Sequence, residues 1–198
     1  MVPDATELLE QIASAKPVNE AEVETKIVLH LLRLLGYSDS DRADKVTVRM
    51  RFGREVLEKI ADFILYNGAE RSLPNALLCI ENKRIGESLL GADEQVRSYA
   101  TWAGTPFTMA CNGEKIMVAQ FLPGAGVINS TTVRVADLPT EFERIRRMIG
   151  RAEAVLAKER TAPSHNIQHF CVLELGTRSE TYHGGALTGV SEAQAWFG

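Results

Sequence analysis

The spacing of hydrophobic positions changes several times along the chain, and each spacing predicts a different element. Residues 8–15 fit a short helix that ends near Pro17, and a longer helix extends from an Asn19 cap to Gly36. Glu22 stands three residues after that cap, which is the spacing of a capping box. The longer helix has apolar residues at the helical period, namely Val23, Ile27, Val28, Leu31, Leu32, Leu34 and Leu35.

A strict alternation of apolar and polar residues follows this helix. Between residues 45 and 52 apolar and polar side chains take turns, which predicts a half-buried strand with a basic outer face. After a turn at Gly53-Arg54, residues 56–66 predict the returning strand, and the continuous apolar run 76–80 predicts a central strand covered on both faces. The first strand would bury Val46, Val48, Met50 and Phe52 and expose Lys45, Thr47, Arg49 and Arg51.

Helices and strands also alternate in the second half of the chain. A helix is predicted over 88–103, and the strands 107–111 and 115–121 surround Asn112-Gly113, a strong hairpin signal. A short strand near 132–135 comes next. The last predicted helix begins at Pro139, and its apolar stripe consists of Phe142, Ile145, Ile149, Ala152 and Leu156.

This order of elements predicts the fold class and the domain organisation. Helix, strands, helix, strands and helix fit an α/β fold with a central mixed sheet flanked by helices. We expect residues 1–160 to form this domain. Residues 161–198 have poor periodicity and are interpreted as a tail, or as the start of a segment that this chain does not complete.

Composition excludes several classes of protein. With 198 residues, of which 45% are hydrophobic, the chain can bury a core, so extensive disorder is excluded. Three cysteines without a CxxC pair predict free thiols in a reducing compartment. There is neither a long apolar run nor a signal peptide, which predicts a cytoplasmic protein with no membrane contact. A net charge of −4 limits any nucleic-acid contact to a local basic patch.

Acidic residues in apolar strands are the first candidates for chemistry. Asp62 lies in an otherwise apolar segment, where an ionised carboxylate is costly unless it is paired or binds a cation. Glu81 and Lys83 end the next strand and share one face of it. If the two strands are neighbours, the three groups converge into a site for a hard divalent cation. The alternative is a strand-end ion pair with Asp62 satisfied by backbone donors.

Three further features bear on this hypothesis. Glu24 heads an apolar helix stripe, either as a functional acid or as a helix-start acid favoured by the macrodipole. Gln95 and Tyr99 are four residues apart and share a helix face, where they could hydrogen-bond a charged group or simply lie at the surface. Arg49 and Arg51 belong to a basic cluster over residues 42–54, which is either a phosphate-tracking wall or a solvated face.

The order of these residues resembles that of the PD-(D/E)XK nuclease superfamily. More narrowly, it resembles the N-terminal nuclease domain of the restriction (R) subunit of type I restriction-modification enzymes. The likeness covers about Val18 to Phe121 and is closest over residues 76–84 and 106–113. It is carried by Glu24, Asp62, Glu81-Asn82-Lys83 and the QxxxY pair Gln95 and Tyr99.

This resemblance implies roles for the residues that carry it. Asp62 and Glu81 would hold Mg²⁺ or Mn²⁺, assisted by the backbone carbonyl of Asn82. Lys83 would orient or activate the attacking water, and Glu24 would be an outer acidic residue near the metal.

The helix pair has an implied role as well. Gln95 and Tyr99 would support the site or contact the DNA backbone. One departure is Ala61, which stands where the family has a proline before the aspartate.

The implied function is that of a Mg²⁺-dependent endonuclease domain, an enzyme that hydrolyses phosphodiester bonds of double-stranded DNA in a restriction system. In the type I enzymes a DNA translocase motor follows the nuclease domain, and this sequence contains no P-loop motif of its own. The resemblance then leaves three alternatives: a fragment of a larger subunit, a stand-alone nuclease relative, or a domain whose partners are separate translocase, methyltransferase and specificity subunits. One alternative is a catalytically silent nuclease-like module for DNA or protein docking. Another is an unrelated mixed α/β domain whose carboxylates coincide with the motif. The joint presence of Asp62, Glu81 and Lys83 favours the nuclease.

Overall fold

The computed structural model describes residues 4–122 and 126–160, and within them it confirms a mixed sheet flanked by helices. Six strands are hydrogen-bonded in the order of the chain, β1-β2-β3-β4-β5-β6. Neighbours are antiparallel except β3 and β4, which are parallel. The strands are β1 (Arg42–Phe52), β2 (Glu55–Tyr66), β3 (Ala76–Asn82), β4 (Phe107–Cys111), β5 (Lys115–Leu122) and β6 (Gly126–Arg134).

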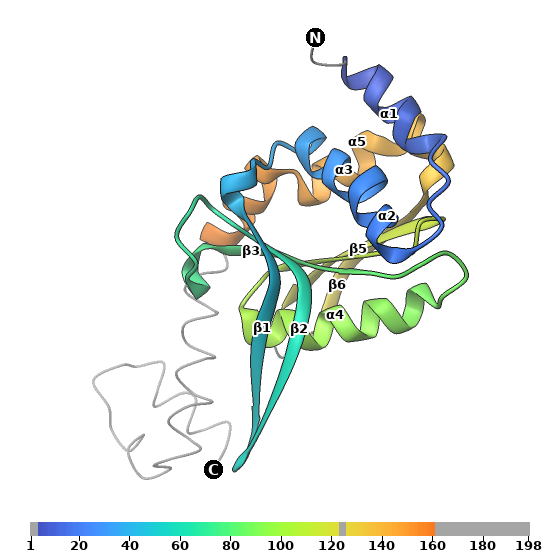
Figure 1. Ribbon diagram of the computed structural model, residues 1–198. Helices are drawn as coiled ribbons and strands as arrows, with labels where there is room; N and C mark the ends of the chain where they lie inside the picture. The colour runs from blue at the N-terminus through green and yellow to red at the C-terminus, as the bar shows by residue number, and fades with distance from the viewer. Residues whose placement is uncertain (1–3, 123–125, 161–198) are drawn as a thin grey trace. The chain divides into compact units, whose positions relative to one another are not determined.

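Helices cover both faces of the sheet (Figure 1). α4 (Leu89–Ala103) connects the parallel strands β3 and β4 and packs on one face, while the other helices lie on the opposite face. These others are α1 (Ala5–Ala13), α2 (Glu20–Val23), the π-helical turn η1 (Glu24–Val28), α3 (Leu29–Leu34) and α5 (Leu138–Ile149). Short 3₁₀ turns occupy η2 (Asp39–Asp41), η3 (Leu73–Asn75) and η4 (Val135–Asp137).

Each face of the sheet has its own apolar core. The larger core joins α1, α3 and α5 to one face and contains the fully buried Ile12, Leu31 and Ile145. The smaller core lies under α4, where Val96 and Ala100 pack against Cys79 and other strand residues. Covering both faces of β3 with helices agrees with its continuous apolar run.

The predicted N-terminal helix begins and ends as expected, but its middle is wound differently. The Asn19 side chain accepts a hydrogen bond from the Glu22 amide at 2.9 Å. The Glu22 carboxylate accepts from the Val18 amide rather than from that of Asn19, so the reciprocal bond is displaced by one residue. Gly36 has φ +88°, which suits the residue after a helix end. A π turn begins at Glu24, and such turns are frequent at functional sites.

Over residues 46–61, strands β1 and β2 pair with each other but not with β3, and they extend past α4 as a two-stranded ribbon, called the ribbon below (Figure 1). β2 pairs with β3 only over Phe63–Tyr66, and residues 51–60 are all exposed. The prediction that Phe52 is buried is wrong: its side chain is 55% exposed and touches Trp102 edge-on at 5.7 Å. Ile60 is likewise exposed, because nothing in the described chain covers this part of the ribbon.

The C-terminal helix is interrupted. α5 ends at Ile149, Gly150 is extended, and a second helical segment occupies residues 151–160. This break turns Ala152 and Leu156 outward, so the prediction of one continuous buried stripe is wrong at both positions; both residues are exposed, Leu156 by 51%. Strand β6 is longer than the predicted 132–135. The predicted tail, with its Cys171, lies outside the described residues, and Cys79 and Cys111 are buried free thiols.

Asp41 ties the first half of the chain to the C-terminal helical segment. Its buried carboxylate accepts hydrogen bonds from Ser38, Gly68 and Arg151, the last at 3.2 Å. Burial by itself raises the pKa of Asp41, but the bonds from Arg151, Ser38 and Gly68 outweigh it and leave this pKa below its ordinary value. The described part of the chain has no helix long and apolar enough to cross a membrane.

Candidate metal centre

Asp62 and Glu81 lie on the adjacent antiparallel strands β2 and β3. The last backbone pair in this register is Phe63 with Ile80, and one step further along it Asp62 stands opposite Glu81. Both residues are buried, with exposed fractions of 6% and 3%. The sheet therefore brings the two predicted ligands to neighbouring positions at one site.

Both carboxylate oxygens of Asp62 have partners. Oδ2 accepts a hydrogen bond from the backbone N–H of Asn82 at 2.6 Å, and Oδ1 accepts one from Lys45 Nζ at 2.7 Å. The same ammonium donates to Glu24 Oε1 at 2.9 Å. A backbone donor and a lysine thus offset the cost of burying this acid in an apolar strand.

Glu81 is only half satisfied. Its Oε1 accepts from Lys83 Nζ and from Gln95 Nε2, both at 2.6 Å. Its Oε2 is buried and has no hydrogen-bond partner among residues 4–122 and 126–160. Burial raises the pKa of Glu81 to about 7, the nearby charge of Asp62 adds to this rise, and Lys83 opposes it. A buried carboxylate with one open oxygen is suited to bind a cation.

The QxxxY pair lies behind Glu81. Gln95 donates to both the Glu81 carboxylate and the Tyr99 hydroxyl, the second at 2.8 Å, because residues four apart share a face of α4. Tyr99 is 5% exposed, and burial raises its pKa. Of the two roles expected for this pair, support of Glu81 is the one that these contacts favour over contact with the DNA backbone.

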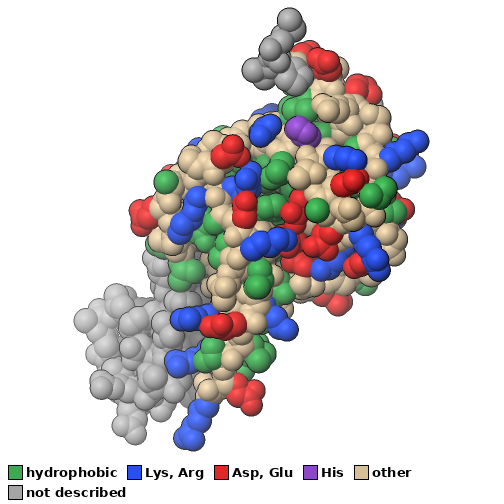
Figure 2. All heavy atoms as spheres, in the orientation of Figure 1, with side chains coloured by type: hydrophobic (Ala, Val, Ile, Leu, Met, Phe, Trp, Pro, Cys, Tyr) green, Lys and Arg blue, Asp and Glu red, His purple; other side chains and the backbone are tan. Residues whose placement is uncertain are grey.

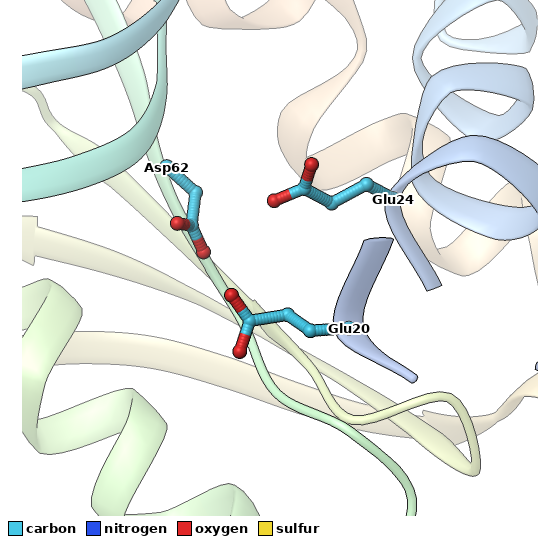
Figure 3. Close-up of side chains that lie close together, drawn as sticks. All are labelled: Glu20, Glu24 and Asp62. Atoms are coloured by element: carbon cyan, nitrogen blue, oxygen red, sulfur yellow. The ribbon is translucent and has the colours of Figure 1, made fainter. Parts of the chain in front are cut away.

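A fourth acid of the site, Glu20 at the start of α2, was not identified from the sequence. Oxygens of Glu20, Glu24 and Asp62 lie within 4.8 Å of one another, and the three side chains point toward one another in Figure 3. Burial and the charge of Asp62 raise the pKa of Glu20. The available signal was the spacing of four residues between Glu20 and Glu24, which places both on one side of a helix.

Lys45 corrects a second expectation. The alternating pattern assigned it to the outer face of the strand, but its side chain reaches Asp62 and Glu24. Ala43 and Val46 both pack in the core under α4, although residues three apart should face opposite sides of a strand. The alternation is therefore broken between them, at Lys45, whose φ is +48°.

The remaining predicted residues lie in two places. Arg49 and Arg51 are exposed on the ribbon, and Arg49 forms an ion pair with Glu58 at 2.8 Å. The structure does not pair either arginine with the carboxylates of the site within the described chain. Asn82 is fully buried, and neither polar atom of its side chain has a partner in the parts of the chain that are described.

The site as a whole has more carboxylates than cations. Figure 2 shows acidic side chains gathered beside basic ones where the ribbon leaves the rest of the fold. Hard divalent cations such as Mg²⁺ and Mn²⁺ prefer oxygen donors, and the open Oε2 of Glu81 together with the grouped carboxylates of Glu20, Glu24 and Asp62 agrees with that donor set. The residues present therefore fit the implied metal. The carboxylates are those of Glu20, Glu24, Asp62 and Glu81, and the cations are Lys45 and Lys83.

Comparison with known proteins gives two distant structural neighbours. No protein-family model matches the sequence, and no curated protein matches it. A fragment described as an HsdR subunit of a type I restriction enzyme from Vibrio vulnificus YJ016 has 20% identity and a TM-score of 0.46, over 69% of this chain and 26% of that one. A DrdV–DNA complex has 14% identity and a TM-score of 0.41, over 72% of this chain and 13% of that one. This chain spans about a quarter of the first protein, so its function is inferred from its own residues.

Proposed function

We propose that this chain is a divalent-metal-dependent endonuclease domain of the PD-(D/E)XK type that hydrolyses phosphodiester bonds of double-stranded DNA. The observation that carries the proposal is the open, buried Oε2 of Glu81 in a site where Asp62 lies on the neighbouring strand β2 and Lys83 directly follows the end of β3. Carboxylates next to a lysine are the groups that this hydrolysis requires, since charge develops on the phosphate oxygens.

Each residue of the site has a place in this chemistry. Asp62 and Glu81 would hold Mg²⁺ or Mn²⁺, with the backbone carbonyl of Asn82 as a further ligand. When bound, the metal polarises the phosphate and lowers the pKa of a water molecule. Gln95 holds Glu81 in place from behind.

Lys83 has a different task from the acids. Its ammonium has three donors and cannot ligate a cation. It now donates to Glu81 Oε1, and its side chain is 21% exposed, so it can also face a phosphate or a water molecule that enters from solvent. We assign it the orientation of the attacking water and the neutralisation of phosphate charge.

The substrate would approach along the ribbon. Arg49 and Arg51 are exposed there, and such side chains contact phosphates without reading sequence. A chain of net charge −4 with a few such contacts should bind DNA weakly by itself, with a Kd of about 10⁻⁴ to 10⁻⁶ M at physiological salt. We therefore propose that it acts with translocase, methyltransferase and specificity subunits, as the type I resemblance implies.

One observation favours a second candidate, a docking module without catalysis. The ribbon exposes Phe52, Val56, Leu57 and Ile60, and apolar side chains gathered on one projection are typical of protein contacts. Metal-dependent cleavage distinguishes the two candidates, because a docking module would not cleave.

The experiment is a nicking assay on supercoiled plasmid with Mg²⁺, Mn²⁺ or Ca²⁺. Asp62→Asn and Glu81→Gln should each abolish cleavage, because each removes a charged ligand. Glu10→Gln, an exposed acid of α1 outside the ribbon and the site, is the control and should cleave like the wild type. Folding of every variant is checked by circular dichroism. Undiminished cleavage by Asp62→Asn or Glu81→Gln would refute the assignment, and a parallel assay with RNA tests the choice of DNA.

A further inference from the structure

Lys45 occupies the place between two carboxylates where a cation would be expected. Its Nζ lies 2.7 Å from Asp62 Oδ1 and 2.9 Å from Glu24 Oε1. Glu20 belongs to the same group of acids, so one ammonium sits among three carboxylates. The close approach of like charges is unfavourable without a positive charge between them, and Lys45 supplies that charge in the protein itself.

Lys45 and the backbone of Asn82 contact different oxygens of the Asp62 carboxylate. The other Asp62 oxygen, Oδ2, accepts the backbone amide of Asn82 at 2.6 Å, so one of its two lone pairs is taken by the backbone, whereas Oδ1 has no backbone donor. Lys45 holds that oxygen. A metal ion that binds Asp62 must therefore displace the ammonium or tolerate a positive charge beside it, and both reduce its affinity.

The backbone of Lys45 is a second, independent observation. Its φ of +48° lies in the left-handed region, and it is the one residue other than glycine with a positive φ in residues 4–122 and 126–160. A side chain with a Cβ rarely adopts this conformation, because the Cβ approaches the carbonyl oxygen. Here it aims the lysine at the acids instead of at solvent, which the alternation of the strand would otherwise favour.

The ammonium can also leave. The Lys45 side chain is 52% exposed, whereas those of Glu24 and Asp62 are 16% and 9% exposed. A half-exposed lysine can rotate into water without disturbing the core, while the two carboxylates stay in place. Lys83, by contrast, donates to Glu81 Oε1 and leaves Oε2 of that residue open.

From these observations we infer that Lys45 is an internal counter-cation that keeps Glu24 and Asp62 together in the metal-free protein and competes with the divalent ion for Asp62. This inference rests on the proposed metal site. Lys45 is a positioning residue in this account. It sets the metal concentration at which the site fills, and its removal should strengthen metal binding while weakening the metal-free fold.

The test is isothermal titration of the full chain with Mn²⁺, alongside thermal unfolding in EDTA. Lys45→Met keeps the length of the side chain and removes its charge, and we expect it to bind Mn²⁺ about tenfold more tightly than the wild type, within the usual range of coupling between two sites. It should also unfold at a lower temperature in EDTA. Lys59→Met, an exposed lysine of the same ribbon, is the control and should change neither quantity.

The outcomes separate this inference from the proposed function. If the wild type binds Mn²⁺ and Asp62→Asn does not, the metal site stands. Equal or weaker binding by Lys45→Met would then overturn the competition alone. If neither the wild type nor Lys45→Met binds Mn²⁺, the metal site and the role of Lys45 fall together. A Lys45→Arg variant that retains wild-type affinity would confirm that the positive charge is responsible.

Discussion

Replacement of Gln95 by leucine is the most informative single change, because it affects the position of Glu81 without removing a proposed ligand. The variant keeps the approximate volume of the side chain and loses the donor that lies 2.6 Å from Glu81 Oε1. A hydrogen bond to a charged acceptor contributes about 1.5–3 kcal/mol. If the loss is felt fully in the transition state, the cleavage rate falls about 10- to 150-fold.

Tyr99→Phe provides the matched comparison. It removes the hydroxyl that accepts from Gln95 at 2.8 Å and leaves the bond between Gln95 and Glu81 in place. The loss of one hydrogen bond between neutral groups costs about 1 kcal/mol, which corresponds to about fivefold in rate. We therefore expect Gln95→Leu to be impaired much more than Tyr99→Phe.

Single-turnover nicking of supercoiled plasmid with Mg²⁺ measures these rates, and urea unfolding in EDTA separates them from effects on stability. Wild-type cleavage by a folded Gln95→Leu variant would refute the claim that Gln95 positions Glu81. An equal loss in both variants would point instead to a general disturbance of α4 (Leu89–Ala103).

The remaining predictions concern other parts of the fold. Lys83→Met should retain Mn²⁺ binding in a calorimetric titration and lose cleavage, since an ammonium is not a ligand; lost binding with unchanged cleavage would contradict its role. Arg49→Ala/Arg51→Ala should weaken duplex binding and lower the slope of log K against log salt by about 2, the value for two lost phosphate contacts, and an unchanged slope would remove the ribbon from the interface. Asp41 has a lowered pKa in the folded state, so its contribution to stability is present above its ordinary pKa and is lost as the pH falls through the folded pKa. Asp41→Asn should therefore be less stable than the wild type at neutral pH, with a difference that shrinks in acid; a constant difference in urea unfolding would contradict the linkage.

The elements that could be predicted are those whose pattern is local. The strands at 107–111 and 115–121 were predicted to within a residue, because an Asn-Gly turn separates two apolar runs. The helix over 88–103 also formed as predicted, with Ser88 as its cap and Gly104 at φ +68° beyond its end. In these segments local preference and tertiary packing agree.

The parts that could not be predicted depend on contacts distant in sequence. Lys45 follows an alternating pattern that assigns it to solvent, and only the folded chain shows that Asp62 and Glu24 draw it inward. Phe52 fits a buried strand by its spacing, but the ribbon extends past α4, and only the edge-on contact with Trp102 within the described chain covers part of Phe52. Leu156 keeps the helical period, yet the extended Gly150 rotates the following segment.

The candidate site shows the same division. The sequence placed Asp62, Glu81 and Lys83 near one another because strand ends and alternation define their faces. It did not identify Glu20: the spacing of four residues places Glu20 on the same side of the helix as Glu24, but a helix of mixed charge does not show which side faces the sheet.

The most direct measurement of the central claim is an anomalous difference map from a crystal of this chain soaked in Mn²⁺. The account predicts a peak bound by carboxylate oxygens of Asp62 and Glu81, with Glu81 using the Oε2 that has no protein partner in the described chain. The peak should be absent from a soaked crystal of Asp62→Asn. A map of the wild type with no peak between these two carboxylates, or with the ion bound elsewhere, would contradict it.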